Sequence, residues 1–214
     1  MRAILVAAKH LAFAKTRLAP DLPAAERAAL AEAMFRDVLA AALSARSADH
    51  VAVVTSDRRL LEIARGAGAL VIDEEYPRGL NVAVRIATEA LVAHGAQAVC
   101  TVLSDIPLVT GEDIDAVMAA MPSPRGAVMV PSRDLSGTNI IARMPSDIIP
   151  TRFGSQSLAR HREECERIDL PWRIAPLKRP AIDIDLMSDL LEFASVPGMT
   201  HTFSQVARLG IVHG

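Results

Sequence analysis

The chain of 214 residues contains only two cysteines and no apolar stretch long enough to cross a membrane. Cys100 and Cys165 are too few for a disulfide framework or a metal cluster, so we interpret both as structural. No apolar run reaches the roughly 18 residues of a bilayer span, and the apolar start of the chain is too short for a secretory signal. We therefore expect a cytoplasmic protein with no membrane partner.

A strong net charge is also missing, because 23 basic residues against 25 acidic ones leave a formal charge of −2. With 51% hydrophobic and 22% charged residues, the composition is that of a soluble globular protein and argues against a nucleic-acid partner. His50, His94, His161 and His201 are scattered without metal-ligand spacing, and we assign them no role. The length favours a single domain over residues 1–214, and nothing indicates an oligomeric state.

Short apolar stretches alternate with helical patterns along the first two thirds of the chain. Strands are predicted at residues 3–8, 51–55 and 69–72 and from residue 98, with helices at 23–45, 57–65 and 80–93 and from residue 111. Ser56 is a plausible helix N-cap, and Thr110 with Asp113 has the spacing of a capping box. This rhythm predicts an α/β fold with a Rossmann-like, doubly wound, mostly parallel sheet and helices on both faces.

The pattern loosens in the last third of the chain. Further strands are predicted at residues 127–130, 139–142 and 172–175, with helices at 155–168, after a cap at Ser188, and at 201–214.

The apolar run from residue 98 ends abruptly at Asp105, and Pro107 has no N–H with which to continue a strand. In an open α/β sheet, ligands bind beyond the carboxyl ends of the parallel strands. Asp105 is therefore a candidate to hold a metal ion or a substrate hydroxyl. An ordinary turn aspartate is the alternative interpretation.

A second acidic feature is the alternating stretch Ile182-Asp183-Ile184-Asp185-Leu186. In an extended segment, the two carboxylates point to one face and the isoleucines to the other, with the acids about 7 Å apart. A hard cation such as Mg²⁺ between them would relieve their repulsion, whereas a solvated acidic edge strand is the alternative. If Asp105 faces the same point, the three carboxylates form a magnesium site.

Basic residues gather in the loop after the first strand, where Lys9, Lys15 and Arg17 occur without an acid. Phosphate-binding loops occupy this place in α/β folds, and the cations would neutralise a triphosphate and a departing pyrophosphate. The loop lacks the glycines of a Walker A or dinucleotide-binding motif. A solvated basic loop without a ligand is the alternative.

Two loops of small residues, Ser136-Gly-Thr-Asn139 and Arg152-Phe-Gly-Ser-Gln-Ser157, offer hydroxyl and backbone N–H groups. Such groups at a helix N-terminus suit a phosphate or a carboxylate, although turn formation alone would also explain them.

These segments together resemble the phospholactate/phosphoenolpyruvate guanylyltransferase family, which makes the precursor of the deazaflavin coenzyme F-420. The resemblance runs from about residue 3 to 192 and keeps the order of the family's motifs. It is carried by Lys9 with Ala14-Lys-Thr-Arg-Leu18, Gly79-Leu-Asn81, Ser104-Asp-Ile-Pro-Leu108, Gly137-Thr-Asn139, Arg152-Phe-Gly154 with Ser157, and Asp183-Ile-Asp185. Gln156-Ser157-Leu158 stands where the family tends to have Gly-Ser-Phe.

The resemblance implies a nucleotide-diphospho-sugar-transferase type of Rossmann-like fold and transfer of GMP from GTP to a three-carbon phosphoacid. The acceptor would be phosphoenolpyruvate, 2-phospho-L-lactate or 3-phospho-D-glycerate. The implied roles are Mg²⁺ binding by Asp105, Asp183 and Asp185, GTP binding by Lys9, Lys15, Arg17, Gly79 and Asn81, and phosphoacid binding by Thr138, Gly154 and Ser157, with Lys15, Arg17 and Asp105 catalytic.

Two other functions remain open at this point. One is another nucleotidyltransferase of the same fold, acting on molybdopterin or on a sugar phosphate, although such enzymes usually begin with a Gly-Gly…Arg loop that is unlike Ala7-Ala8-Lys9. The other is a nucleotide-binding module without catalysis, and fold alone does not decide among them.

Overall fold

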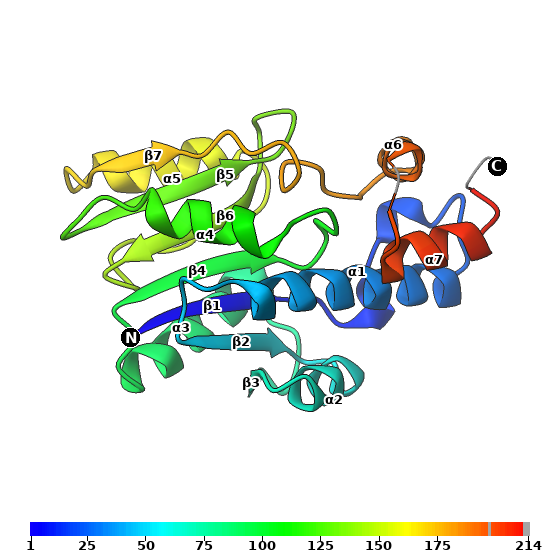
Figure 1. Cartoon of the computed structure of the whole chain (residues 1–214), viewed down its shortest axis with the longest axis horizontal. Helices are drawn as coiled ribbons and strands as arrows, with labels where there is room; N and C mark the ends of the chain where they lie inside the picture. Colours follow the sequence, from blue (N-terminus) through cyan, green and yellow to red (C-terminus); the bar gives the residue numbers. More distant parts are fainter. Residues whose placement is uncertain (197, 212–214) are drawn as a thin grey trace.

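The centre of this computed structural model is a seven-stranded sheet with the strand order β3-β2-β1-β4-β6-β5-β7 (Figure 1). The structure describes residues 1–196 and 198–211. The strands are β1 (Arg2–Ala7), β2 (His50–Thr55), β3 (Leu70–Asp73), β4 (Ala98–Leu103), β5 (Gly126–Pro131), β6 (Thr138–Met144) and β7 (Trp172–Ile174). The helices are α1 (Ala24–Ser44), α2 (Arg58–Gly66), α3 (Leu80–Ala93), α4 (Gly111–Ala119), α5 (Ser157–Glu166), α6 (Met187–Ser195) and α7 (His201–Arg208), with the short 3-10 helices η1 (Leu11–Phe13) and η2 (Thr16–Leu18).

Four neighbouring strands, β3, β2, β1 and β4, run parallel, as the alternation of strands and helices predicts. The next strand, β6, is antiparallel to both of its neighbours, β4 and β5. The sequence predicts β5, β6 and the turn-rich loop between them, but not that β6 enters the sheet between β4 and β5. Because β6 is antiparallel to β4, its first residue, Thr138, lies beside the carboxyl ends of β1 and β4.

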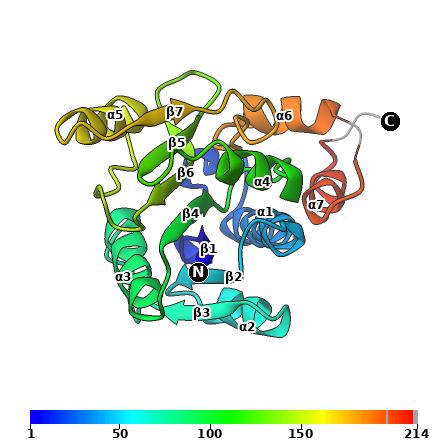
Figure 2. The same cartoon turned by 60° about the vertical axis from the view of Figure 1, so that its left-hand side comes forward.

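Helices cover both faces of the sheet, which confirms the doubly wound α/β prediction (Figure 2). Side chains of α1, α2 and α4 share one apolar cluster, and those of α3 and α5 share the other. Successive residues of β1 alternate between them, since Ile4 lies in the first cluster and Leu5 in the second. Each buried cysteine lies in one of these clusters, and burial raises the pKa of Cys100 to about 12 and that of Cys165 to about 11.

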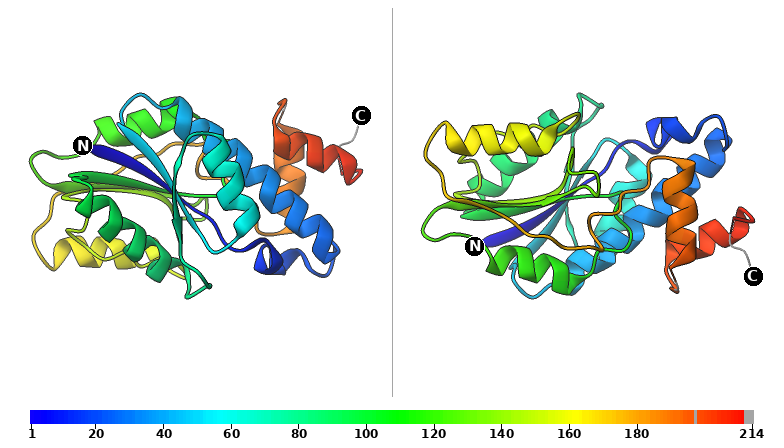
Figure 3. Two further views of the ribbon diagram at one scale, coloured as in Figure 1. Left: turned by 90° about the horizontal axis from the view of Figure 1, so that it is seen from below. Right: turned by 90° about the horizontal axis from the view of Figure 1, so that it is seen from above.

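A third apolar cluster lies beyond the sheet, where α6 and α7 pack at the amino-terminal end of α1 (Figure 3). It combines Leu18 and Leu22 of the N-terminal connection with Leu190 and Phe193 of α6. The predicted tail helix at 201–214 is shorter than expected, because α7 ends at Arg208, and its last three predicted residues lie outside the described ones. None of the helices in the described part of the chain is long and apolar enough to cross a bilayer.

The capping prediction is confirmed for α4 and wrong for α2. The Thr110 hydroxyl accepts the Asp113 N–H, and the Asp113 carboxylate accepts the Thr110 N–H at 3.0 Å. At α2 the cap is Asp57 rather than Ser56, since its carboxylate accepts the N–H groups of residues 59 and 60. A carboxylate is the stronger acceptor here and also favours the positive end of the helix dipole.

Candidate active site

The basic loop (residues 9–17), the acidic segment (residues 178–186) and the two small-residue loops meet beyond the carboxyl ends of β1 and β4. The register pairs Ala7 of β1 with Leu103 of β4, so the residues that follow each strand emerge together. A cavity of about 610 Å³ lies at this end of the strands. It is lined by these site residues predicted from the sequence: Lys9, Lys15, Arg17, Asp105, Thr138, Gly154, Ser157, Asp183 and Asp185.

Lys15 joins the two acidic segments. Its Nζ lies 2.9 Å from Asp105 Oδ2 and 2.9 Å from Asp185 Oδ1, although the three residues are far apart in the sequence. The Ile184 N–H also donates to the Asp105 carbonyl at 3.1 Å, so the backbones of the two acidic segments are themselves in contact. Asp105 is therefore next to the 183/185 pair, as a shared site requires, and residues 182–186 do not form the edge strand of the alternative interpretation.

The charges at this point shift the pKa values of the groups in predictable directions. Burial alone would lower the pKa of Lys15, but the carboxylates of Asp105 and Asp185 raise it above its ordinary value. Burial would raise the pKa of Asp185, but Lys15 and then Arg17 hold it below the ordinary value. Burial and the nearby carboxylate of Asp105 raise the pKa of Asp183. Asp183 is thus the acid that receives least compensation from the lysine.

The residues present fit a divalent cation in their chemistry. Among the described residues, Asp105 Oδ1 is a buried carboxylate oxygen without a hydrogen-bond partner. Three carboxylates gather here, and Asp183 is crowded by two of them. Hard cations prefer such oxygen ligands. The three carboxylates are near one another but do not converge on one point. Within residues 1–196 and 198–211, no three His, Cys, Asp or Glu side chains are arranged closely enough to bind a metal ion together.

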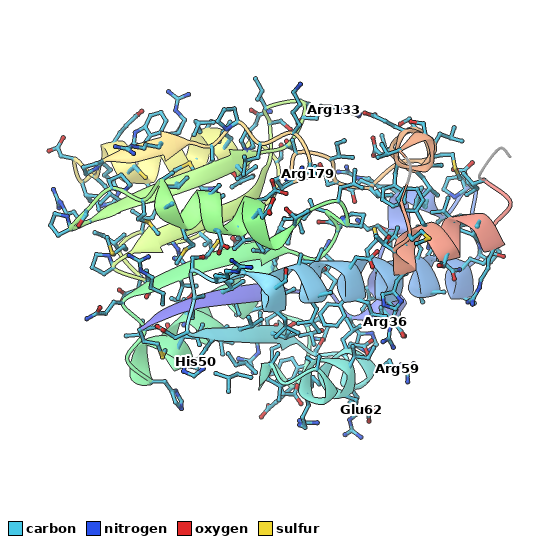
Figure 4. The ribbon with its side chains drawn as sticks, in the orientation of Figure 1. Arg36, His50, Arg59, Glu62, Arg133 and Arg179 are labelled. Atoms are coloured by element: carbon cyan, nitrogen blue, oxygen red, sulfur yellow. The ribbon has the colours of Figure 1, made fainter. Side chains whose placement is uncertain are left out.

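Contacts with three elements hold the acidic segment, residues 178–186, in place. Arg179 donates to both carboxylate oxygens of Asp113 at 2.9 and 2.8 Å, and the Asn139 amide donates to the Pro180 carbonyl at 2.9 Å. The Arg133 N–H donates to the Ala181 carbonyl at 2.9 Å. Figure 4 shows Arg133 and Arg179 on the same side of the molecule, close to this segment. The segment is therefore positioned by long-range contacts and not by a strand ladder.

Two local predictions about this segment need correction. Ile184 is fully buried in the third apolar cluster, as the alternation predicts, but Ile182 lines the cavity together with the acids. Ser188 does not cap α6, which begins before it, at Met187. The Asp189 carboxylate instead accepts the N–H groups of residues 185 and 186 at 3.1 and 2.8 Å.

Lys9 and Arg17 complete the basic side of the cavity. Arg17 is 70% exposed and lies 3.4 Å from Asp185, whereas Lys15 is only 7% exposed. Arg17 can therefore reach a ligand in solvent at little cost in lost pairing, because an exposed ion pair contributes little. Lys15 is instead fixed between the carboxylates, with a left-handed backbone (φ 51°) at the start of η2.

The small-residue loops meet on the other side of the cavity. Thr138 begins β6 and Ser157 begins α5, and both are nearly fully buried. Gly154 has a φ of +115°, which side chains rarely allow, so glycine suits this turn. Behind them, His161 lies 3.1 Å from the Thr138 hydroxyl. Backbone N–H groups and hydroxyls at the N-terminus of a helix favour an anion.

Gly79 and Asn81 lie outside the lining of the cavity, where Leu80 alone of the three takes part. The Asn81 amide is hydrogen-bonded to Phe153, donating to its carbonyl at 3.0 Å and accepting its N–H at 2.8 Å. In this structure Asn81 therefore supports the turn that carries Gly154. Nucleotide binding by Gly79 and Asn81 stays a prediction.

Sequence reasoning assigned no role to His161 or Asp134, which the structure places at the site. Asp134 accepts the hydroxyl protons of Ser132 and Ser136 at 2.6 and 2.7 Å, and these bonds lower its pKa to about 2. The alternating Ser-X-Asp-X-Ser pattern of this loop was a usable signal. His161 follows Ser157 by four residues, the spacing of one helix face, but nothing in the sequence says what that face meets.

Comparison with known proteins gives concordant results. The family described as "Guanylyl transferase CofC like" matches residues 1–212. A phosphoenolpyruvate guanylyltransferase of Sphaerobacter thermophilus is 37% identical over 190 residues, covering 89% of this chain and 91% of that protein. A 3-phospho-D-glycerate guanylyltransferase of Phenylobacterium zucineum is 36% identical over 187 residues, covering 86% and 85%.

A solved structure supports the fold independently. The crystal structure of a protein described as a nucleotide-diphospho-sugar transferase, from Desulfovibrio desulfuricans G20, superposes with a TM-score of 0.80 at 20% identity. The match covers 99% of this chain and 97% of that one, which confirms the predicted fold type. With the match over nearly all its residues and two relatives above 35% identity, this chain belongs to the CofC-like guanylyltransferase family.

Proposed function

We propose that this chain transfers GMP from GTP to a three-carbon phosphoacid, a step in the biosynthesis of the deazaflavin coenzyme F-420. The observation that carries the proposal is that one cavity is lined by Lys15, bonded to Asp105 and Asp185, and also by Thr138 and Ser157. Such a site offers separate places for two anions. We infer the guanylyl donor from the family to which the chain belongs, and the class of acceptor from the names of the relatives.

In the proposed reaction, a phosphate oxygen of the acceptor attacks the α-phosphorus of GTP. The new bond joins this oxygen to phosphorus, and the bond between the α-phosphorus and the bridging oxygen breaks, so that pyrophosphate leaves with the electron pair. Because the attacking phosphate is already ionised, no general base is required. This agrees with a neutral His161, which is buried behind the proposed phosphoacid loops.

The residues of the chain contribute position and charge. Lys9, Lys15 and Arg17 would bind the triphosphate and stabilise charge on the departing pyrophosphate. Thr138, Gly154 and Ser157 would hold the phosphoacid in line with the α-phosphorus. Residues 1–214 would act as one nucleotidyltransferase domain, since the acidic residues come from both halves of the chain.

Asp105, Asp183 and Asp185 would hold Mg²⁺, for which the unpartnered Asp105 oxygen and the raised pKa of Asp183 are the supporting observations. When bound, Mg²⁺ would supply positive charge that screens the phosphates from the carboxylates.

The test is a pyrophosphate-release assay with GTP and, separately, phosphoenolpyruvate, 2-phospho-L-lactate and 3-phospho-D-glycerate. We expect release only when GTP and one of these acids are both present, with a GMP adduct of that acid detected by mass spectrometry. ATP and CTP are the matched controls for the base, and GTP alone controls for hydrolysis. Binding of GTP without turnover on all three acids would overturn the proposal.

A further inference from the structure

The buried His161 lies directly behind the residues that we propose hold the phosphoacid. It is fully buried on α5, one helical turn after Ser157. Its two ring nitrogens face two different loops, with Nε2 2.7 Å from the Arg152 N and Nδ1 3.1 Å from Thr138 Oγ1. One side chain thus contacts both small-residue loops of the cavity.

The hydrogen bonds determine which nitrogen carries the proton. A backbone N–H can only donate, so Nε2 must accept from Arg152 and carries no hydrogen. The neutral ring then has its proton on Nδ1, which donates to the Thr138 hydroxyl. Burial, and then the positive charges of Arg143 and Arg152, lower the pKa of His161 to about 4, against the opposing effect of the Glu164 carboxylate. The ring is therefore neutral near pH 7.

This arrangement limits the directions in which the Thr138 hydroxyl can donate. Because a lone pair of its oxygen accepts from His161, the hydroxyl proton must point elsewhere. Thr138 lines the cavity, and a hydroxyl that presents its proton there suits an anionic oxygen of a ligand. The bond to the Arg152 N–H also holds the turn that leads to Gly154.

We propose that His161 is a positioning residue for the phosphoacid, which it serves by turning the Thr138 hydroxyl toward the cavity and by holding the turn from Arg152 to Gly154. This inference rests on the proposed function, in which Thr138 and Gly154 bind the acceptor. The ligand chemistry it favours is a phosphate or carboxylate oxygen that accepts the Thr138 proton.

Two substitutions separate the two bonds of the ring. His161→Asn keeps an N–H near the position of Nδ1, and His161→Gln keeps an acceptor near the position of Nε2. We expect His161→Gln to raise the KM for the phosphoacid about tenfold while the KM for GTP stays within about twofold. His161→Asn should raise the KM for the phosphoacid less. Equal increases in both KM values for His161→Gln would overturn the proposal.

A double-mutant cycle with Thr138→Val tests whether His161 acts through the hydroxyl. In the Thr138→Val background, the hydroxyl that His161 turns is gone, so His161→Gln should change the KM for the phosphoacid by less than about twofold. A further tenfold increase in that background would show independent effects and overturn the proposal. Chemical denaturation of each variant identifies loss of folding as a separate cause.

A measurement without substrate keeps this inference distinct from the proposed function. In ¹⁵N-histidine-labelled protein, the signals absent from His161→Gln identify His161 in the wild type. We expect the neutral tautomer with the proton on Nδ1 at pH 7. The Nε2-protonated tautomer or the imidazolium would overturn the positioning role, whereas absence of turnover with the expected tautomer would count against the proposed function alone.

Discussion

At the scale of single residues, the central feature is the ammonium of Lys15 between two carboxylates. Its contacts with Asp105 and Asp185 raise its pKa and keep it charged, although burial alone would lower the pKa. Among the described residues, Asp183 has no ion-pair partner of this kind, and its Oδ1 accepts a 3.3 Å hydrogen bond from the Asn139 amide. The surplus negative charge therefore concentrates on Asp183 and on the buried Oδ1 of Asp105, where a divalent cation would be most stabilising.

The aspartates can be tested by isosteric substitution. Asp105→Asn, Asp183→Asn and Asp185→Asn should each lower kcat at saturating GTP by about 100-fold or more, because each removes one carboxylate charge that would hold the proposed cation. Their circular dichroism spectra should match that of the wild type. The measurement is pyrophosphate release with varied Mg²⁺.

Glu62→Gln is the matched control for this series, since it neutralises an exposed acid on α2, away from Arg133 and Arg179 (Figure 4). Near-normal release by any of the three folded aspartate variants would contradict the assignment of that residue.

At the scale of elements, the acidic segment at 178–186 is positioned by its contacts with α4, β6 and the loop before β6. The most specific of these is the two-pronged bond between Arg179 and Asp113. Asp113 also forms the capping box of α4, so the start of this helix and the position of the acids are linked through one carboxylate. Two parallel hydrogen bonds of an arginine fix orientation as well as distance.

Arg179→Met should therefore affect GTP binding more than stability. Arg179 is 53% exposed, and its nearly buried partner Asp113 keeps its hydrogen bonds from Thr110, so we expect the substitution to lower the free energy of unfolding by about 1 kcal/mol. The KM for GTP should rise severalfold, because the acidic segment loses an anchor. Steady-state kinetics and chemical denaturation measure the two effects.

Arg85→Met provides the comparison, because it breaks an exposed pair with Glu89 on α3 and leaves the acidic segment untouched. If both variants had the same KM for GTP as the wild type, Arg179 would not position the acids.

At the scale of the whole molecule, the site lies at the carboxyl ends of the parallel strands. There the apolar clusters on the two faces of the sheet meet the third apolar cluster. The third cluster packs Leu18, just after the basic loop, together with Ile184, between the two acids. Burial of these side chains brings the cations of the first 20 residues to acids more than 160 residues away. The same apolar contacts therefore stabilise the fold and assemble the site.

The buried His161 links global stability to pH. Its folded pKa of about 4 lies below the ordinary value of 6.5, so between these values the unfolded chain binds a proton that the folded chain excludes. This contribution to stability is present above pH 6.5 and is lost as the pH falls toward 4, by about 3 kcal/mol in total.

Chemical denaturation at several pH values between 7 and 4 measures this effect, and His161→Gln is the comparison. The stability of the variant should fall less steeply over this range, since glutamine does not titrate. Parallel curves for the two proteins would contradict a depressed pKa for His161.

Local patterns in the sequence determined the strands, most helices, the capping box of Thr110 with Asp113 and the family motifs, because each depends on residues a few positions apart. The charged groups of the site were recognisable for the same reason. The hydropathy of an apolar run predicts that it is buried, and a carboxylate at the end of such a run, such as Asp105, can therefore be identified as a candidate site residue.

Only the tertiary structure decided which segments meet. The insertion of β6 between β4 and β5, the contacts of Arg179 and the bonds of His161 join residues that are far apart in the sequence, so no local pattern encodes them. Asn81 faces Phe153 instead of the cavity for the same reason. The chain itself specifies which groups carry charge and which seek burial, and close packing of the whole molecule selects their partners.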